Sequence, residues 1–168
     1  MNQDIITIVN EHDEIIWEKN RLDITQDDIY RVSALEIRNT KGDFLLAQRG
    51  FLKSKWPWKR SVAVAGTVDV WETYDDNIYK EAEEEIGLTG VLFKKEDKVR
   101  KQTPNGNYFC QYYSIILDRS AGKFILEEWQ VENIRWFSSE EIKHLLKNSP
   151  EIFWYTSITR MGEQLLNK

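Results

Sequence analysis

The segment from Gly66 to Leu88, GTVDVWETYDDNIYKEAEEEIGL, predicts one helix in the middle of the chain and concentrates negative charge near its end. Thr73 is typical of an N-cap, aspartates follow it in the first turn, and Gly87 stands just past the expected end. Near that end the helix dipole disfavours each anion by roughly 0.3 to 1 kcal/mol. The acids concerned are Glu81, Glu84 and Glu85. Because the cluster opposes local stability, we expect a function that requires it.

These glutamates lie within an arc of about 100° on one face of the predicted helix, beside an apolar stripe. The stripe consists of Ile78, Ala82 and Ile86. Carboxylates without neighbouring Cys or His favour Mg²⁺, Mn²⁺ or Ca²⁺ over zinc, and magnesium often completes its shell with substrate phosphates. A solvated acidic helix face is the alternative interpretation of the charge alone.

The composition, 168 residues with 41% hydrophobic and 30% charged, is most simply that of one domain over residues 1–168, since no linker-like stretch interrupts it. The net charge of −5 argues against a stable nucleic-acid partner. No apolar run is long enough to span a membrane, and the N-terminus lacks the basic region of a signal peptide. The single cysteine, Cys110, agrees with a reducing compartment. We therefore expect a cytoplasmic protein with no membrane partner; homodimer formation stays open.

Strand-like segments occur on both sides of the predicted helix. An N-terminal β-hairpin is expected over residues 1–20, from IITIVN and EIIWEK, and a second hairpin from RVSALEIR and FLLAQR. After the helix, VLFKKEDKVRKQ and YFCQYYSIIL flank the turn-forming TPNGN and predict a third strand pair.

Helical signals return at the C-terminal end of the chain. Ser138 and Glu141 resemble a capping box that opens a short helix through Leu146. Ser149 followed by Pro150 predicts the start of a C-terminal helix over residues 149–168. The order of these elements predicts an α+β fold, arranged as an α/β/α sandwich.

The central segment resembles the Nudix box, G-x5-E-x7-R-E-U-x-E-E-x-G-U, in which U is aliphatic. The residues at the defined positions are Gly66, Glu72, Lys80, Glu81, Ala82, Glu84, Glu85, Gly87 and Leu88. Lys80 replaces the arginine of the pattern; it retains a charge that would pair with Glu72 or another acid, but lacks the bidentate fork. The resemblance implies the Nudix fold with a mixed central sheet, and divalent-metal-dependent attack of water on a diphosphate linkage.

The resemblance also implies a role for each acid of the box. Glu84 and Glu85 would be the principal ligands of Mg²⁺ or Mn²⁺, and Glu81 a further ligand or the residue that positions or deprotonates water. Gly66, Glu72, Lys80 and Gly87 would have structural roles, the first by permitting a close approach and the last by ending the helix.

The stretch AQRGFLKSKWPWKR, just before the box, combines basic residues with tryptophans. Arg49 and Lys53 could clamp a diphosphate, and Trp56 could stack on a base or cover an apolar group. A solvated basic loop is the alternative interpretation.

This stretch also resembles isopentenyl diphosphate isomerase, a Nudix relative, in which an arginine and a lysine at the positions of Arg49 and Lys53 bind the diphosphate. The chain departs from that pattern, because Ala65 stands at the cysteine position and Thr67 at a metal-binding histidine. Gln130 replaces the second acid of a later E-x-E pair, whose first acid corresponds to Glu128. From that correspondence we expect Glu128, rather than Glu127 or Glu132, to supply a further ligand or general base.

Three functions follow as alternatives. The first is a Nudix hydrolase that cleaves a nucleoside diphosphate derivative or another small diphosphate. The second is an isomerase-like enzyme acting on isoprenoid diphosphates, and the third is a catalytically weak domain that senses a nucleotide. The intact acids of the box favour the hydrolase.

Overall fold

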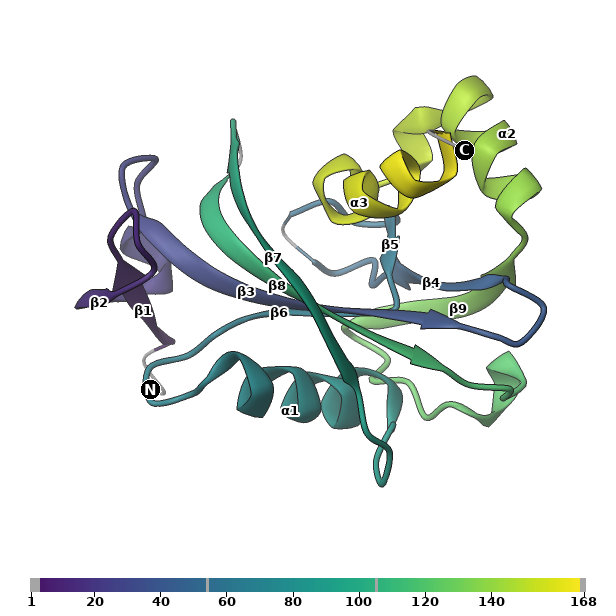
Figure 1. Ribbon diagram of the computed structural model, residues 1–168, viewed down its shortest axis with the longest axis horizontal. Coiled ribbons are helices and arrows are strands. Elements are labelled where there is room, and N and C mark those ends of the chain that lie inside the picture. The colour runs from purple at the N-terminus through teal and green to yellow at the C-terminus, as the bar shows by residue number, and fades with distance from the viewer. Residues whose placement is uncertain (1–3, 54, 105, 167–168) are drawn as a thin grey trace.

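The computed structural model describes residues 4–53, 55–104 and 106–166, which form a sheet between helices (Figure 1). The strands are β1 (Ile5–Val9), β2 (Ile15–Asn20), β3 (Ile29–Arg38), β4 (Phe44–Arg49), β5 (Arg60–Val62), β6 (Val64–Thr67), β7 (Lys94–Thr103), β8 (Gly106–Ile116) and β9 (Val131–Phe137). The α-helices are α1 (Tyr74–Ile86), α2 (Ser139–Asn148) and α3 (Tyr155–Leu166), with short 3₁₀ turns at Arg21–Asp23, Ala121–Lys123 and Pro150–Ile152.

The long strand β3 organises the mixed sheet. It pairs antiparallel with β1, β4 and β6, and parallel with β8 along most of its length. The expected hairpins are present, since β2 pairs antiparallel with β1 and β7 with β8. Residue 105, in the predicted turn of the β7–β8 hairpin, lies outside the described residues.

Alternation along the central strands builds two cores, one on each face of the sheet. Leu35 and Ile37 point toward the buried stripe of α1, whereas Ala34 and Leu46 pack with the core under α2 and α3. In Figure 1, α1 covers one face of the sheet and α2 and α3 lie on the other. This arrangement confirms the predicted α+β class and α/β/α layers.

The start of the C-terminal helix differs from the prediction. Pro150 opens only a 3₁₀ turn, the backbone is extended at Phe153, and α3 begins at Tyr155 rather than at Ser149. Phe153 forms a parallel bridge with Arg60, so tertiary pairing overrides the local helix signal. The ends of two predicted ranges, residues 1–3 of the hairpin and 167–168 of the helix, lie outside the described residues.

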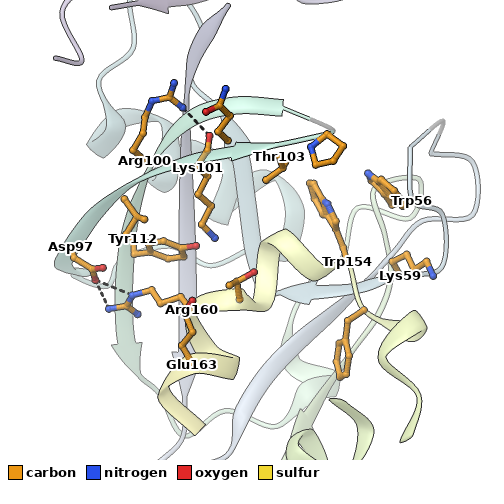
Figure 2. Close-up of a pocket in the computed structure, with 15 residues that line it drawn as sticks. Trp56, Lys59, Asp97, Arg100, Lys101, Thr103, Tyr112, Trp154, Arg160 and Glu163 are labelled. Carbon is orange, nitrogen blue, oxygen red and sulfur yellow. Dashed lines mark hydrogen bonds and ion pairs between the residues drawn. The ribbon is translucent and has the colours of Figure 1, made fainter. Parts of the chain in front are cut away.

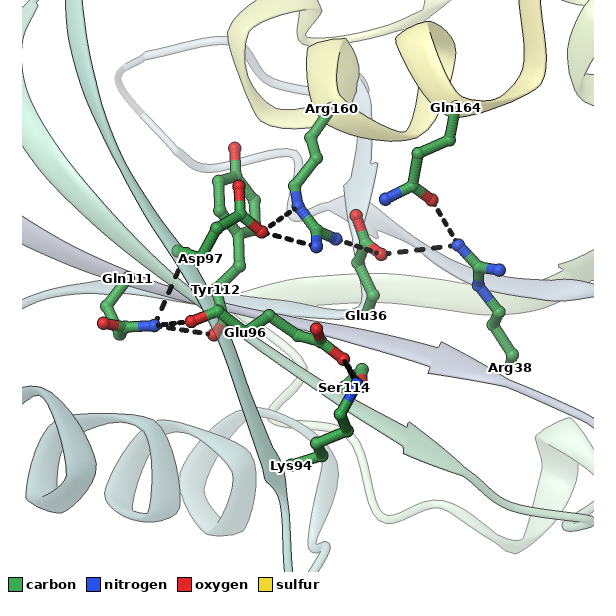
Figure 3. Close-up of polar contacts among 10 residues, drawn as sticks. All are labelled: Glu36, Arg38, Lys94, Glu96, Asp97, Gln111, Tyr112, Ser114, Arg160 and Gln164. Carbon is green, nitrogen blue, oxygen red and sulfur yellow. Dashed lines mark hydrogen bonds and ion pairs between the residues drawn. The ribbon is translucent and has the colours of Figure 1, made fainter. Parts of the chain in front are cut away.

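An ion-pair network attaches α3 to the sheet (Figure 3). Glu36 on β3, with only 1% of its side chain exposed, accepts a hydrogen bond of 2.9 Å from Arg160 on α3. Arg160 also donates to Asp97 on β7 at 2.6 and 2.9 Å. The helix is therefore held to two strands by one guanidinium group. In the described part of the chain, no helix is long and apolar enough to cross a membrane.

Candidate active site

The ends of α1 are defined by the residues that the sequence predicted. The Thr73 hydroxyl accepts a hydrogen bond from the backbone N–H of Asp76, whose carboxylate accepts one from the backbone of Thr73. At the other end, Gly87 adopts φ +62°, a conformation that favours glycine, and a side chain there would meet Ile125 at 2.8 Å. With its apolar stripe buried, α1 presents its acids along a neighbouring face.

Glu81 and Glu85 lie against strand β6. A Cβ atom at Gly66 would come within 2.2 Å of Glu81 Oε1, so the glycine is required for this contact. The backbone N–H of Ala65 donates a hydrogen bond to the Glu85 carboxylate. Burial raises the pKa of Glu81 to about 7. Burial, followed by the charge of Glu81, raises the pKa of Glu85 to about 8.

Glu84, the third predicted metal ligand, is exposed. Across the described ranges, no three His, Cys, Asp or Glu side chains come together as a ready-formed metal site. The donor set of two partly buried carboxylates and a third on the adjacent surface nevertheless suits a hard divalent cation.

Lys80 and Glu72 form the ion pair expected for their positions in the box. The Lys80 ammonium contacts Glu72 Oε1 at 2.5 Å and Asp69 Oδ2 at 2.9 Å. The buried amide of Asn77 donates to Glu72 Oε2 at 2.9 Å. Burial opposes ionisation of Glu72, but the hydrogen bonds from Lys80 and Asn77 hold its pKa below the ordinary value. The loop between β6 and α1, residues 68–73, here called the box loop, is thereby attached to α1. Asp69 and Asn77 were not predicted from the sequence.

Arg49 and Lys53 lie close enough to Glu85 for its charge to act on them. Arg49 and Glu85 line one small pocket with Gln130 and Trp154, and the negative charge of Glu85 acts on both cations. The Lys53 ammonium donates to Gln130 Oε1 and stands 4.1 Å from the centre of the Trp129 ring. Burial lowers the pKa of both Arg49 and Lys53. Cations held beside buried acids can bind an anionic phosphate.

Arg21 and Trp154 belong to this region although sequence reasoning missed them. Burial is the main cause of the pKa shifts of Glu81, Arg49 and Lys53, and the positive charge of Arg21, directly after β2, makes a smaller contribution to each. The Arg49 guanidinium stacks 4.8 Å from the centre of the Trp154 ring. Neither residue lies in a motif, so no sequence signal could have found them.

Trp56, predicted to contact substrate, does not line the pocket beside Glu85. It lines a separate cavity of about 590 Å³ between the β7–β8 hairpin, α3 and the segment before β5 (Figure 2). Its backbone has φ +56°, which is unusual for a residue other than glycine. Trp56 thus lines a different cavity from Arg49, although the Arg49 guanidinium donates to the carbonyl of Lys55, the residue next to Trp56, at 3.2 Å.

Glu128 is exposed in a turn that directly precedes β9. The preceding backbone is bound to the helix, because the N–H of Glu127 donates to the carbonyl of Glu85 at 3.2 Å and that of Ile125 to the carbonyl of Ile86 at 3.2 Å. Glu132 is exposed on β9. The loop that carries Glu128 thus adjoins the buried acids.

Comparison with known proteins relates this site to one family. The model of the NUDIX domain matches residues 29–155. The Nudix hydrolase YfcD of Escherichia coli (strain K12) is 27% identical over 138 residues, which cover 82% of this chain and 75% of YfcD. The crystal structure of DR0079 from Deinococcus radiodurans superimposes with a TM-score of 0.76 at 22% identity, over 86% of this chain and 90% of that one.

A more distant structural neighbour is the NUDIX domain of Shewanella oneidensis NrtR in complex with ADP ribose. Its TM-score is 0.53 at 12% identity, over 69% of this chain and 75% of that one. Nudix hydrolases generally cleave nucleoside diphosphate derivatives and use divalent metal ions. The domain match spans most of the chain and its curated relatives carry the same family name, so this protein belongs to the Nudix hydrolase family.

Proposed function

We propose that this protein hydrolyses a diphosphate linkage in a nucleoside diphosphate derivative or a similar small diphosphate, with Mg²⁺ or Mn²⁺ as cofactor. The observation that carries the proposal is the placement of the partly buried Glu81 and Glu85 against β6, with Glu85 in one pocket with Arg49 and its charge acting on Lys53. Paired acids next to cations suit a site where a cation and a phosphate bind together.

Glu81, Glu84 and Glu85 would hold the metal ion, with Glu84 rotating from the surface. A divalent ion there would neutralise phosphate charge and lower the pKa of the attacking water. Arg49 and Lys53 would bind the phosphate oxygens, and Arg21 would add a third positive charge near them. Lys80, Glu72 and Asn77 would hold the box loop so that Gly66 and Ala65 keep their contacts with the acids.

An isomerase-like reaction is less well supported. Ala65 and Thr67 cannot protonate or deprotonate a carbon atom, and the backbone N–H of Ala65 is bound to Glu85. Gln130 stands where the isomerase pattern has the second acid of its E-x-E pair. Its side-chain oxygen accepts a hydrogen bond from Lys53 and so helps to position that cation.

The test replaces Glu85 by Gln, which removes the charge and retains the size of the side chain. We expect hydrolysis of a panel of nucleoside diphosphate derivatives to require added Mg²⁺ or Mn²⁺, and turnover to fall by at least about 10²-fold in Glu85→Gln. Glu83→Gln, on the exposed side of the same helix, is the matched control and should retain activity. Normal turnover in folded Glu85→Gln would refute the assignment.

A further inference from the structure

Lys80 stands where the Nudix box has an arginine, and this difference changes how the Glu72 carboxylate is bound. An arginine can bind both oxygens of a carboxylate with two parallel N–H groups, whereas the ammonium of lysine is a compact point charge. Here the Lys80 ammonium contacts Glu72 at Oε1, at 2.5 Å, and also contacts Asp69 Oδ2, at 2.9 Å. The lysine thus divides its donors between two carboxylates.

The other oxygen of Glu72 is bound by Asn77, which lies on α1. The side-chain N–H₂ group of Asn77 donates to Glu72 Oε2 at 2.9 Å, and the backbone N–H of Asp69 donates to the same oxygen at 3.2 Å. Lysine and asparagine together therefore give Glu72 what one arginine gives a carboxylate, namely a single positive charge and a side-chain N–H at each oxygen.

The amide of Asn77 is itself held in one orientation. Asn77 is fully buried, and its second N–H donates to the carbonyl of Thr67 at 3.1 Å. Its oxygen accepts a hydrogen bond of 2.5 Å from the hydroxyl of Ser33, which is fully buried too. The opposite orientation would direct the amide oxygen at the two acceptors Thr67 and Glu72. Such a buried network, in which each group of the amide has a partner, is rigid.

This network joins α1 to the strand that the candidate metal ligands contact. Ser33 on β3 pairs directly with Gly66 on β6, and Thr67 is the last residue of β6. Gly66 is the residue that leaves room for Glu81. Figure 1 shows β3 and β6 side by side above α1. Asn77, about one helical turn before Glu81, therefore holds α1 to β6 close to the acids of the site.

We propose that Asn77, oriented by Ser33, supplies the second hydrogen bond to Glu72 that the arginine of the Nudix box would supply, and thereby makes lysine sufficient at position 80. Both are positioning residues, since they act on Glu81 and Glu85 through β6 and the box loop. The inference rests on the proposed function for its effect on metal binding, and it adds two residues that the pattern of the box does not define.

The test combines Asn77→Ala with Lys80→Arg, which restores the residue of the box pattern. Electron paramagnetic resonance of free Mn²⁺ would measure metal affinity without substrate. Asn77→Ala should weaken this affinity by about tenfold or more, as the loss of groups that orient metal ligands typically does. In the Lys80→Arg protein the second N–H of the guanidinium can bind Glu72 Oε2, so Asn77→Ala should weaken the affinity by about threefold or less.

Melting temperatures measured with a chelator test the same coupling without a metal ion. Lys80→Arg should raise the melting temperature of Asn77→Ala by about 3 °C more than it raises that of the wild type. The reason is that the added N–H finds an oxygen without its donor only when Asn77 is replaced. The lost contacts with Ser33 and Thr67 are common to both backgrounds and cancel in the comparison.

Ile78→Val is the matched control, because Ile78 is buried in the apolar stripe of the same helix and side chains two residues apart on a helix do not face each other. Its Mn²⁺ affinity should stay within about twofold of the wild type, and Lys80→Arg should shift its melting temperature as in the wild type. If Asn77→Ala does not fold, Ser33→Ala serves instead. It removes only the hydroxyl that orients the amide, and Lys80→Arg should rescue it in the same direction.

Two results would overturn the inference: an Mn²⁺ affinity that Asn77→Ala leaves unchanged, or a melting-temperature shift from Lys80→Arg that is the same with and without Asn77. Failure of the proposed function would look different, because the wild type would then bind no Mn²⁺ or turnover would not depend on Glu85. In that case the melting temperatures would still decide whether Asn77 replaces the second donor of the arginine.

Discussion

Glu81 and Glu85 show how neighbouring residues determine the properties of a single side chain. Gly66 leaves room for Glu81, and the N–H of Ala65 binds Glu85, so both side chains lie against β6 and are partly buried. Burial raises both pKa values, and the charge of Glu81 adds to the shift at Glu85. The protein therefore loses stability when it ionises these acids without a compensating cation.

This cost predicts that the stability of the metal-free protein depends on pH. The folded-state pKa values, about 7 for Glu81 and about 8 for Glu85, lie above the ordinary value of 4.5. Their contribution to stability is therefore fully present below about pH 4.5 and is lost as the pH rises through 7 and 8. With a chelator present, the melting temperature should fall between about pH 4.5 and 8 more steeply in the wild type than in Glu85→Gln. Identical slopes would contradict this prediction.

Glu128 and Glu132 differ in their relation to the buried acids. Glu128 lies in the loop whose backbone binds the end of α1, whereas Glu132 lies on β9. We expect Glu128→Gln to lower kcat under saturating Mg²⁺ more than Glu132→Gln does, because a nearby carboxylate could accept a proton from water or bind a second metal ion. Steady-state kinetics of both variants would measure this. A larger loss of kcat in Glu132→Gln would contradict the prediction and assign the role of ligand or general base to Glu132.

At the level of elements, α1 combines good caps with an unfavourable distribution of charge. Thr73 and Asp76 form a capping box, and Asp75 and Asp76 suit the positive end of the helix dipole. The last turn contains acids and no basic residue. The helix is thus stabilised at its start and by its buried stripe, which compensate for the charges near its end.

Removing the cap should therefore destabilise the protein measurably. Thr73→Ala deletes the acceptor for the Asp76 N–H and should lower the free energy of unfolding by about 1 kcal/mol, determined by urea denaturation. Ser120→Ala is a matched control, because Ser120 precedes the 3₁₀ turn Ala121–Lys123 without forming a side-chain cap hydrogen bond. This variant should lose little free energy of unfolding. Equal losses in the two variants would show that the Thr73 hydroxyl does not stabilise α1.

Across the whole molecule, the position of α3 depends on a buried charge. Glu36 has 1% of its side chain exposed and Arg160 has 14%, so the pair lies largely outside solvent (Figure 3). One Glu36 oxygen has no hydrogen-bond partner within the described residues. Removal of Arg160 would leave this buried carboxylate with only the longer ion pair to Arg38, at 3.7 Å, which costs more than the loss of a surface ion pair.

We predict that Arg160→Met lowers the free energy of unfolding by about 3 to 5 kcal/mol. The double variant Glu36→Leu with Arg160→Met should be more stable than Arg160→Met, because it removes a buried charge that the longer ion pair to Arg38 compensates only in part. Lys94→Met, which breaks an ion pair whose lysine side chain is 75% exposed, should cost less than about 1 kcal/mol. Chemical denaturation would measure the free energies of unfolding of the three variants and so test their predicted order of stability. A double variant that is no more stable than Arg160→Met would contradict the prediction.

The sequence alone determined α1, its caps, the spacing of its acids and the alternation that creates two faces of the sheet. These features are local, because each depends on residues within a few turns or on the period of a strand. The tertiary structure decided the rest. The bridge between Arg60 and Phe153 delays α3 to Tyr155 and places Trp154 against Arg49. The β1–β2 hairpin brings the charge of Arg21 to Glu81, and the β7–β8 hairpin and α3 enclose a cavity away from the box. Such contacts join residues far apart in the chain, so the local pattern that predicts a helix or a strand carries no information about them.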